Sequence, residues 1–145
     1  TDQGGNLFIS GAYIASDFTE NKDTSASNFA KEILHYTWRT NFAVRSGQVY
    51  STDYGKPGFN IQFDFNTDFN PNIYTVEAPD ALEPNGLGAK VAFRYSENNA
   101  SAGVFYEGKY KSLVLGFPFE AILEKNMRIQ LMQQIIDYFG SNSNL

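Results

Sequence analysis

The stretch Gly4-Gly5-Asn6-Leu7-Phe8-Ile9-Ser10-Gly11-Ala12-Tyr13-Ile14-Ala15-Ser16-Asp17 decides the fold of this chain. Its glycine pair is typical of a helix end, the apolar run from Leu7 to Ile9 predicts a buried strand, and Ser10-Gly11-Ala12 predicts a sharp turn. In open α/β folds, ligands and catalytic groups gather at the carboxyl ends of strands. This turn is therefore the first place to expect a functional site.

The start of the chain has the pattern of a fold interior. The three residues before Gly4-Gly5 are too few to form the helix that this pair would end. We therefore expect residues 1–145 to form a single domain that is the carboxyl-terminal part of a larger protein, with the remainder of that polypeptide as a partner.

The composition is that of a folded, aromatic-rich domain. Apolar residues make up 42% and aromatic residues 16% of the 145 positions, unlike a disordered chain. The net charge of −5 argues against non-specific nucleic-acid binding, which needs Lys and Arg to displace counterions. No apolar run approaches the roughly 18–20 residues of a membrane span. The absence of cysteine excludes disulfides, thiolate zinc sites and a cysteine nucleophile.

Two segments carry helical periodicity. From about Ser27 to Tyr36, apolar residues recur at helical spacing after candidate N-cap serines. From about Leu123 to Phe139, the apolar residues form one face of an amphipathic helix, and Gly140 follows as its expected C-cap.

Strand patterns outnumber helix patterns between these two segments. Phe59 to Phe65 alternates apolar and polar residues, which predicts a sheet with one buried and one solvated face. The continuous apolar runs Leu7 to Ile9 and Leu113 to Leu115 predict central strands that are covered on both faces. Further strands are expected at residues 43–50, 73–76, 90–95, 102–106 and 112–115.

Four segments resemble a known family. Residues 4–17, and residues 113–120 with the helix that follows them, resemble the first and closing parts of a glutamine-amidotransferase-like α/β domain. Residues 74–80 and 93–99 are similar to the carboxyl-terminal regions of exported bacterial proteins labelled xanthan lyases. The resemblance implies an α/β three-layer sandwich, a degenerate class I glutamine-amidotransferase-like (flavodoxin-like) fold with a β-rich insertion. It also implies export to the periplasm, the cell surface or the medium.

The same resemblance argues against amidotransferase chemistry. That reaction needs a cysteine at the turn, activated by a histidine and an acid, whereas this chain has Ser10 there and a single histidine, His35. A serine hydrolase based on Ser10 is an alternative, but the G-x-S-x-G pattern of a nucleophile elbow is absent. The other interpretation of His35 is a structural histidine at a helix end.

The lyase label directs attention to the polar cluster of residues 94–99, Arg-Tyr-Ser-Glu-Asn-Asn. Polysaccharide lyases combine a Tyr or His base with Arg or Asn side chains that neutralise a uronic acid. Arg94, Glu97 and Asn98 are therefore candidate catalytic or ligand-binding residues. The alternative is a polar hairpin in which Arg94 pairs with a carboxylate.

Two acidic residues follow the first and last predicted strands. In a parallel sheet, Asp17 and Glu120 would lie at the same carboxyl edge as Ser10, which makes them candidate site residues. Their alternative role is to cap helices and compensate helix dipoles.

Carbohydrate binding has physical support in the aromatic content. Sugar rings stack on exposed aromatic faces, and the candidate platforms are Trp38, Tyr36, Tyr50, Tyr54 and Tyr74. The alternative is that these rings pack in the core or against hairpins.

One segment has the spacing of a metal loop. Asp64, Asn66 and Asp68 occur at alternate positions, as at the start of a calcium loop. However, Phe69 stands where an EF-hand needs Gly, and Thr75 stands where it needs Glu. Simple strand alternation explains the same spacing, so we expect neither a metal nor another cofactor.

These patterns predict a non-catalytic accessory or interaction module of an exported bacterial protein, linked to polysaccharide binding or degradation. The alternative is a polysaccharide lyase or serine hydrolase. That enzyme would use the Arg94–Asn99 cluster or Ser10, with His35 and Glu120 as further catalytic candidates.

Overall fold

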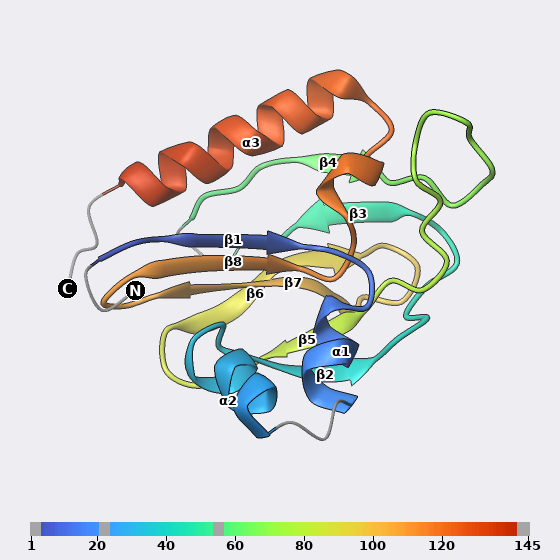
Figure 1. Ribbon diagram of the computed structural model, residues 1–145. Helices are drawn as coiled ribbons and strands as arrows, with labels where there is room; N and C mark the ends of the chain where they lie inside the picture. The colour runs from blue at the N-terminus through green and yellow to red at the C-terminus, as the bar shows by residue number, and fades with distance from the viewer. Residues whose placement is uncertain (1–3, 21–23, 54–56, 142–145) are drawn as a thin grey trace.

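The fold is a mixed α/β arrangement, given by a computed structural model that describes residues 4–20, 24–53 and 57–141. Figure 1 shows a curved sheet with helices on both sides. The elements are β1 (Leu7–Ser10), α1 (Ile14–Glu20), α2 (Thr24–Glu32), β2 (Tyr36–Thr40), β3 (Gln48–Ser51), β4 (Gln62–Asp64), β5 (Ala81–Pro84), β6 (Ala89–Tyr95), β7 (Ser101–Glu107), β8 (Lys111–Leu115), the 3₁₀ turn η1 (Phe119–Ala121) and α3 (Lys125–Gly140).

The main sheet has six strands in the order β1-β8-β7-β6-β3-β4. Only β1 and β8 are parallel, with Leu7 opposite Ser112 and Ser10 opposite Leu115. The other neighbours are antiparallel, and β2 and β5 form a separate antiparallel pair. The predicted carboxyl edge of parallel strands therefore exists, but it is made by this one pair.

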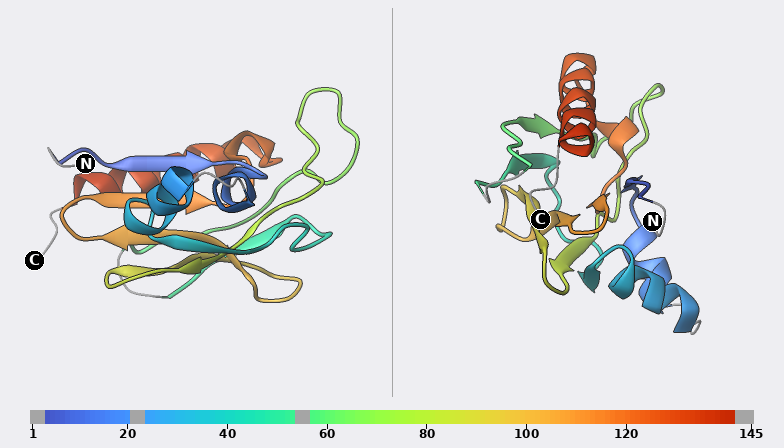
Figure 2. Two further views of the ribbon diagram at one scale, coloured as in Figure 1. Left: turned by 60° about the horizontal axis from the view of Figure 1, so that its bottom comes forward. Right: turned by 90° about the vertical axis from the view of Figure 1, so that its left-hand side faces the viewer.

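Strand β8 is buried on both faces, because alternate side chains enter two different cores. Leu113 and Leu115 pack in the larger core beneath α3, together with Leu131 and Ile135 of that helix. Val114 points into the smaller core, which α1, α2, β2 and β5 close. The two views in Figure 2 show α3 on one side of the sheet and α1 and α2 on the other. The prediction that residues 113–115 form a central strand is confirmed.

The matching prediction for residues 7–9 is wrong about the position of the strand in the sheet, although Phe8 packs against the larger core and Leu7 and Ile9 pack against the smaller one. Strand β1 pairs only with β8 and forms an edge of the sheet, so each of its residues is partly exposed. An apolar run alone does not distinguish an edge strand beside a helix from a central strand.

The first predicted helix is also wrong at its carboxyl end. Helix α2 ends at Glu32, and residues 36–40 form β2, which pairs with β5. His35 has a positive φ of 58°, which breaks the helical path before the β-favouring residues that follow. The sequence analysis missed α1 and β5, and it assigned a strand to residues 73–76, which form a loop.

The remaining assignments differ mainly at their ends. Helix α3 includes Gly140, and Ser141 is its C-cap. Strands β3 and β4 are shorter than the expected 43–50 and 59–65, whereas β6, β7 and β8 match their predicted ranges to within a residue. No helix among the described residues has the length and hydrophobicity needed to cross a membrane.

Candidate functional site

The turn between β1 and α1 holds a strained aromatic residue. Tyr13 has a φ of 69°, which non-glycine residues rarely adopt, and its side chain is 38% exposed. The turn is fixed from both sides, because the Ser10 Oγ accepts a hydrogen bond from the Phe119 amide (3.1 Å) and the Ser16 hydroxyl donates to the Tyr13 carbonyl (3.0 Å). The Ser10 hydroxyl therefore has a structural role at the carboxyl edge.

Asp80 anchors this turn from a distant part of the sequence. One oxygen of its fully buried carboxyl group accepts from the amides of Ala15 (3.1 Å) and Ser16 (3.4 Å), and the other accepts from the Trp38 Nε1 (3.2 Å). Burial raises the pKa of Asp80 to about 6, against the opposing effect of these three N–H donors. Because its carboxyl group accepts from two amides in the first turn of α1, Asp80 acts as a helix cap that is supplied from another loop.

Several loops gather beside this turn. Figures 1 and 2 show the loops that carry residues 10–13, 41–47, 66–80 and 96–100 at the same end of the molecule; we call these four segments the loop end. The Ala43 amide donates to the Pro79 carbonyl (2.9 Å), and the Asn98 side-chain amide donates to the Ala43 carbonyl (2.8 Å). These bonds join the loops into one structured surface.

The longest of these loops is closed around a buried asparagine. Asn66 is 5% exposed, its carbonyl accepts from the Val76 amide (2.9 Å), and its side-chain nitrogen lies 2.7 Å from the Asp68 carbonyl and 3.2 Å from the Ile73 carbonyl. This is the pattern of a compact Ω-loop organised from inside. The candidate calcium spacing thus has another explanation: Asn66 points inward as a donor, whereas Asp64 is exposed on β4.

The loop end displays most of the exposed aromatic side chains. Among the described residues, five aromatic side chains are exposed, and Tyr13, Phe42 (64%), Phe69 (90%) and Tyr74 (52%) belong to this end. Phe42 shares the left-handed backbone of Tyr13, with a φ of 49°. Strained backbone and exposed aromatic rings both lower the stability of the folded state, and both concentrate at functional surfaces. This surface is therefore the candidate binding site.

The Arg94–Asn99 cluster comprises the last two residues of β6 and the turn that leads to β7. Arg94 donates to the Asn99 carbonyl (2.7 Å), and Glu97 accepts from the amides of Ser46 (2.7 Å) and Arg45 (2.9 Å). These amide bonds lower the pKa of Glu97. The geometry matches the polar-hairpin alternative in outline, but the partner that Arg94 has among the described residues is a backbone carbonyl and not a carboxylate.

Ser10 and His35 lie at opposite ends of the sheet. Ser10 is paired with Leu115 at the end of β8, whereas the His35 ring contacts the Tyr110 hydroxyl (3.0 Å), just before β8 begins. At about 3.3 Å per residue, the length of β8 separates them by roughly 15 Å. His35 stacks on Tyr106 with ring centres 3.6 Å apart, and burial lowers the pKa of its imidazole. The two residues therefore do not form a nucleophile–base pair.

The two acidic candidates follow the two strands of the parallel pair, β1 and β8. Asp17 is exposed on α1, directly after the turn. Glu120 is exposed in η1, next to the Phe119 amide that Ser10 binds. Strands β1 and β8 are parallel, as the expectation for these two residues requires, but no described contact links either carboxylate to the Ser10 hydroxyl.

The predicted aromatic platforms are only partly accessible. Tyr36 is fully buried, so its assignment as a platform is wrong. Trp38 is partly buried with its ring nitrogen bound to Asp80, and Tyr54 lies outside the described residues. Tyr74 is exposed as expected. The sequence analysis missed Phe69, although its position in the turn-rich segment Asp-Phe-Asn-Pro-Asn was a usable signal.

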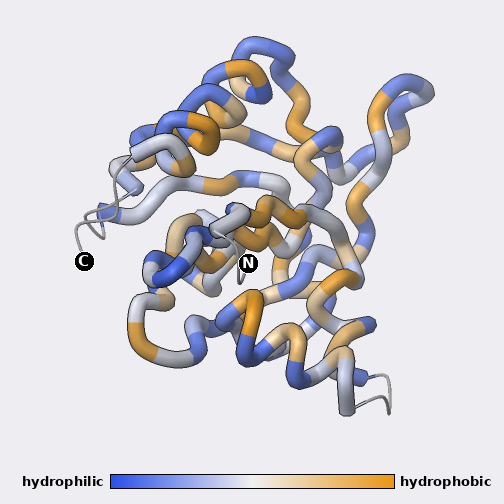
Figure 3. Tube along the Cα trace, turned by 60° about the vertical axis from the view of Figure 1, so that its left-hand side comes forward, coloured by the Kyte–Doolittle hydropathy of each residue, from blue (hydrophilic) through white to orange (hydrophobic). Residues whose placement is uncertain are grey.

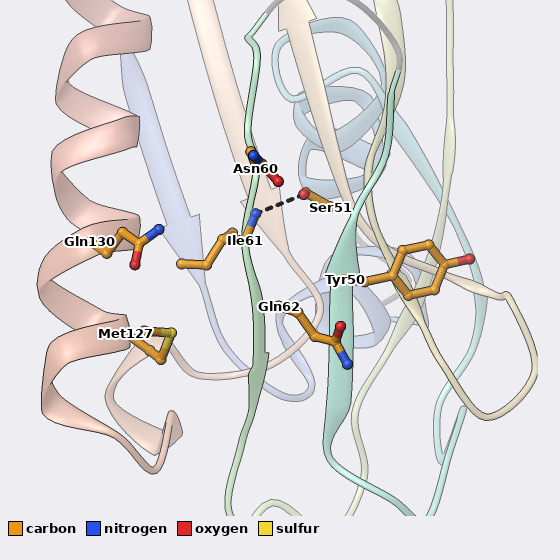
Figure 4. A pocket seen from close by; sticks show the side chains of 7 residues that line it. All are labelled: Tyr50, Ser51, Asn60, Ile61, Gln62, Met127 and Gln130. Atoms are coloured by element: carbon orange, nitrogen blue, oxygen red, sulfur yellow. Dashed lines mark hydrogen bonds between the residues drawn. The ribbon is translucent and has the colours of Figure 1, made fainter.

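A second candidate surface is a shallow groove of about 430 Å³ beside β4. Figure 4 shows that its side chains do not converge: Gln130 and Met127 come from α3, and Ile61 points toward that helix, whereas Tyr50 and Gln62 point away. Without convergent polar groups, this groove is a weaker candidate site than the loop end. Its lining consists of Tyr50, Ser51, Asn60, Ile61, Gln62, Met127 and Gln130.

Comparisons with known proteins bear on the fold. No protein-family model matches the chain, and no curated protein matches it. Among solved structures, the chain is similar to a cold-adapted β-galactosidase from Rahnella sp. R3, with a TM-score of 0.58 and 10% sequence identity. The match covers 92% of this chain but only 18% of that chain. The chain thus has the fold of a small part of a larger enzyme, and at this identity the likeness concerns the fold alone.

Proposed function

We propose that this chain is a non-catalytic interaction module of an exported bacterial protein and that its loop end binds polysaccharide. The observation that carries the proposal is the grouping of Tyr13, Phe42, Phe69 and Tyr74 as exposed rings on one structured end. Aromatic faces provide a flat apolar surface for the C–H faces of sugar rings, and a polar group beside them can hydrogen-bond the hydroxyls. The Asp and Asn residues around Phe69 supply such groups.

The order of the loop end favours binding. Asn66 holds the long loop from inside, and Asp80 fixes the strained turn at Tyr13. A surface that is organised before its ligand arrives loses less conformational entropy on binding. This supports recognition by a preformed surface.

The charge of the chain favours neutral sugars over acidic ones. A net charge of −5 creates a negative potential that repels polyanions such as uronic-acid polymers. We therefore expect the preferred ligand to be a neutral polysaccharide.

The positions of the catalytic candidates support a non-catalytic role. Ser10 and His35 are separated by the length of β8, and Arg94 bonds the backbone of its own hairpin. We further propose that the fold is a degenerate class I glutamine-amidotransferase-like arrangement, in which the strand–turn–helix at Tyr13 lacks a nucleophile. In this proposal the module works as part of a larger polypeptide.

The test is a glycan-array screen of the purified chain, followed by titration calorimetry with the best ligand. The variants Phe69→Ala and Tyr74→Ala should each weaken binding about tenfold, since losing one stacking contact costs on the order of 1 kcal/mol or more. Leu87→Ala is the matched control, because Leu87 is 97% exposed in the β5–β6 turn, outside the loop end. Equal binding by all three variants, or no glycan bound, would reject the proposal.

A parallel assay separates binding from catalysis. Wild-type protein is incubated with acidic polysaccharides, and unsaturated products are followed by ultraviolet absorbance. We expect no product. Product formation that Arg94→Ala abolishes would replace the binding module with a lyase.

A further inference from the structure

The turn between β5 and β6 contains the dipeptide Asn85-Gly86 in an open conformation. Gly86 is exposed and has a φ of 91°, and its amide N–H has no hydrogen-bond acceptor within the described part of the chain. Figures 1 and 3 show this turn on the outside of the molecule, away from the loop end. The Gly86 nitrogen is therefore unpaired, unhindered by a side chain and open to water, so it can approach the side-chain carbonyl carbon of Asn85.

The exposed asparagines of the β6–β7 turn lack this freedom. The amide that follows Asn98 is that of Asn99, and it donates to the Tyr95 carbonyl (2.9 Å). The amide that follows Asn99 is that of Ala100, and it donates to the Asn98 Oδ1 (3.0 Å). In both cases the nitrogen that would attack is held by another acceptor and carries a side chain on its α-carbon. The structure thus distinguishes Asn85 from other asparagines on the surface.

His35 lies against the same dipeptide. The Asn85 amide donates to the His35 carbonyl (2.8 Å), and a methyl group added to the Gly86 α-carbon would lie 3.7 Å from the His35 Nδ1. Burial lowers the pKa of the imidazole, against the opposing effect of its contact with the Asn85 backbone, so the ring is uncharged at neutral pH. An uncharged imidazole can accept a proton from a neighbouring group.

We propose that Asn85 is a site of self-modification, at which the Gly86 amide nitrogen attacks the asparagine side chain and converts it to aspartate or isoaspartate. His35 takes the Gly86 amide proton as the bond from this nitrogen to Cγ forms. The bond between Cγ and Nδ2 then breaks, and the imidazolium returns the proton to the departing nitrogen, which leaves as ammonia. Water adds to either carbonyl of the resulting succinimide and opens the ring.

The modification would change a contact between two elements. The Asn85 side-chain amide donates to the Lys31 carbonyl (3.1 Å) in the last turn of α2. A carboxylate at this position has no proton to donate and places negative charge at the carboxyl end of a helix, next to Glu32, where the helix dipole disfavours it. The reaction should therefore weaken the attachment of α2 to the β5–β6 turn. Because the site is remote from the loop end, the proposal is independent of polysaccharide binding.

Peptide mapping of the intact chain after prolonged incubation at neutral pH tests the proposal. A glutamyl protease that cleaves after Glu77, Glu97 and Glu107 releases residues 78–97, in which Asn85 is the only asparagine, and residues 98–107, which contain Asn98 and Asn99 as internal controls. Relative to a sample without incubation, the first peptide should gain the mass difference between an amide and a carboxyl group and should separate into aspartate and isoaspartate forms. No gain in the first peptide, or an equal gain in both, would overturn the proposal.

The variant His35→Asn tests the proton acceptor. Asparagine tolerates the positive φ at this position, and the loss of the imidazole should slow the mass gain by about tenfold or more. If His35 only held the turn in place, its loss would loosen the turn and speed the reaction. Circular dichroism verifies that the variant is folded. A rate equal to or above that of the wild type would overturn the role of His35.

Discussion

The two ends of the molecule use aromatic residues in opposite ways. At the loop end, Phe69 and Tyr74 extend into solvent. At the other end, which comprises residues 33–36, 106–111 and 138–141 and which we call the packed end, His35 stacks on Tyr106 and the Tyr138 hydroxyl donates to the Tyr106 carbonyl (2.7 Å). The same residue types therefore stabilise the fold at one end and are displayed at the other.

The difference lies in what surrounds the polar groups. At the packed end, Lys111 is 2% exposed, and its ammonium donates to the carbonyls of Tyr138 and Ser141 and to the Ser141 hydroxyl. This cation closes the carboxyl end of α3, where positive charge is favoured. At the loop end, the polar groups hold strained turns in place. The polar contacts of the packed end thus stabilise the fold, whereas those of the loop end fix the conformation of an exposed surface.

The largest expected effect is at the packed end. Lys111→Met should lower the free energy of unfolding by about 3 kcal/mol, because buried carbonyls lose a charged donor. Urea unfolding measures the loss. Lys109→Met is the matched control, since Lys109 is exposed in the turn just before β8 and should change stability by less than about 0.5 kcal/mol. Equal losses in the two variants would show that the Lys111 contacts contribute no specific stability.

The next effect concerns Asp80 and the pH dependence of stability. Burial raises the folded-state pKa of Asp80 from 3.8 to about 6, so the folded state binds more protons than the unfolded state between these values. Stability from this group therefore falls as pH rises from about 4 to about 6, by on the order of 3 kcal/mol. Asp80→Asn should remove this pH-dependent decrease in the free energy of unfolding. The amide can also change the free energy of unfolding by the same amount at every pH, which does not affect the slope.

The readout for Asp80 is the slope of the unfolding free energy against pH. Asp64→Asn removes an exposed carboxylate on β4 and should keep the wild-type slope. An Asp80→Asn profile parallel to that of the wild type would mean that Asp80 titrates in the folded state much as it does in the unfolded state.

A smaller effect tests the strained backbone at the loop end. Phe42→Gly should be about 1 kcal/mol more stable than Phe42→Ala, because glycine adopts a positive φ without the Cβ clash. Phe69 is outside the set of positive-φ residues, so the order should reverse there, with Phe69→Ala more stable than Phe69→Gly. The same order at both positions would contradict a strained turn at Phe42.

The smallest effect is a pH slope of opposite sign at the packed end. Burial lowers the folded-state pKa of His35, so the unfolded state binds more protons below the usual value of 6.5. Stability from this group is therefore present above that pH and is lost as pH falls through it. His35→Asn tolerates the positive φ and should remove the slope. A slope that persists in the variant would have to come from another group.

The sequence predicted those parts of the fold whose pattern is local. The periodicity of residues 123–139 indicated α3, and the continuous run at residues 113–115 indicated the buried strand β8. Tyr36 was assigned to the end of a helix and β2 was missed, because the pairing of β2 with β5 is a contact more than 40 residues away in sequence. Strand β1 was assigned to the centre of the sheet because an apolar run does not reveal how many neighbours a strand has.

The candidate site was less predictable than the fold. Ser10, Asp17 and Glu120 were expected at one edge because the carboxyl ends of parallel strands meet, and β1 and β8 are indeed parallel. Tyr36 and Phe69 were misjudged in opposite directions, since one ring is buried and the other is 90% exposed. Exposure of an aromatic side chain depends on which elements cover it, and no local pattern contains that information.

The sequence by itself determined the acidic charge, the lack of a thiol nucleophile, the amphipathic helix α3 and the turn of small residues after β1. Only the tertiary structure decided that Ser10 and His35 lie at opposite ends, that Asp80 caps α1, and that Phe42, Phe69 and Tyr74 belong to one end. The physical reason is that charge and periodicity are properties of neighbouring residues. Burial and the grouping of loops arise when strands that are distant in sequence pair and close two cores.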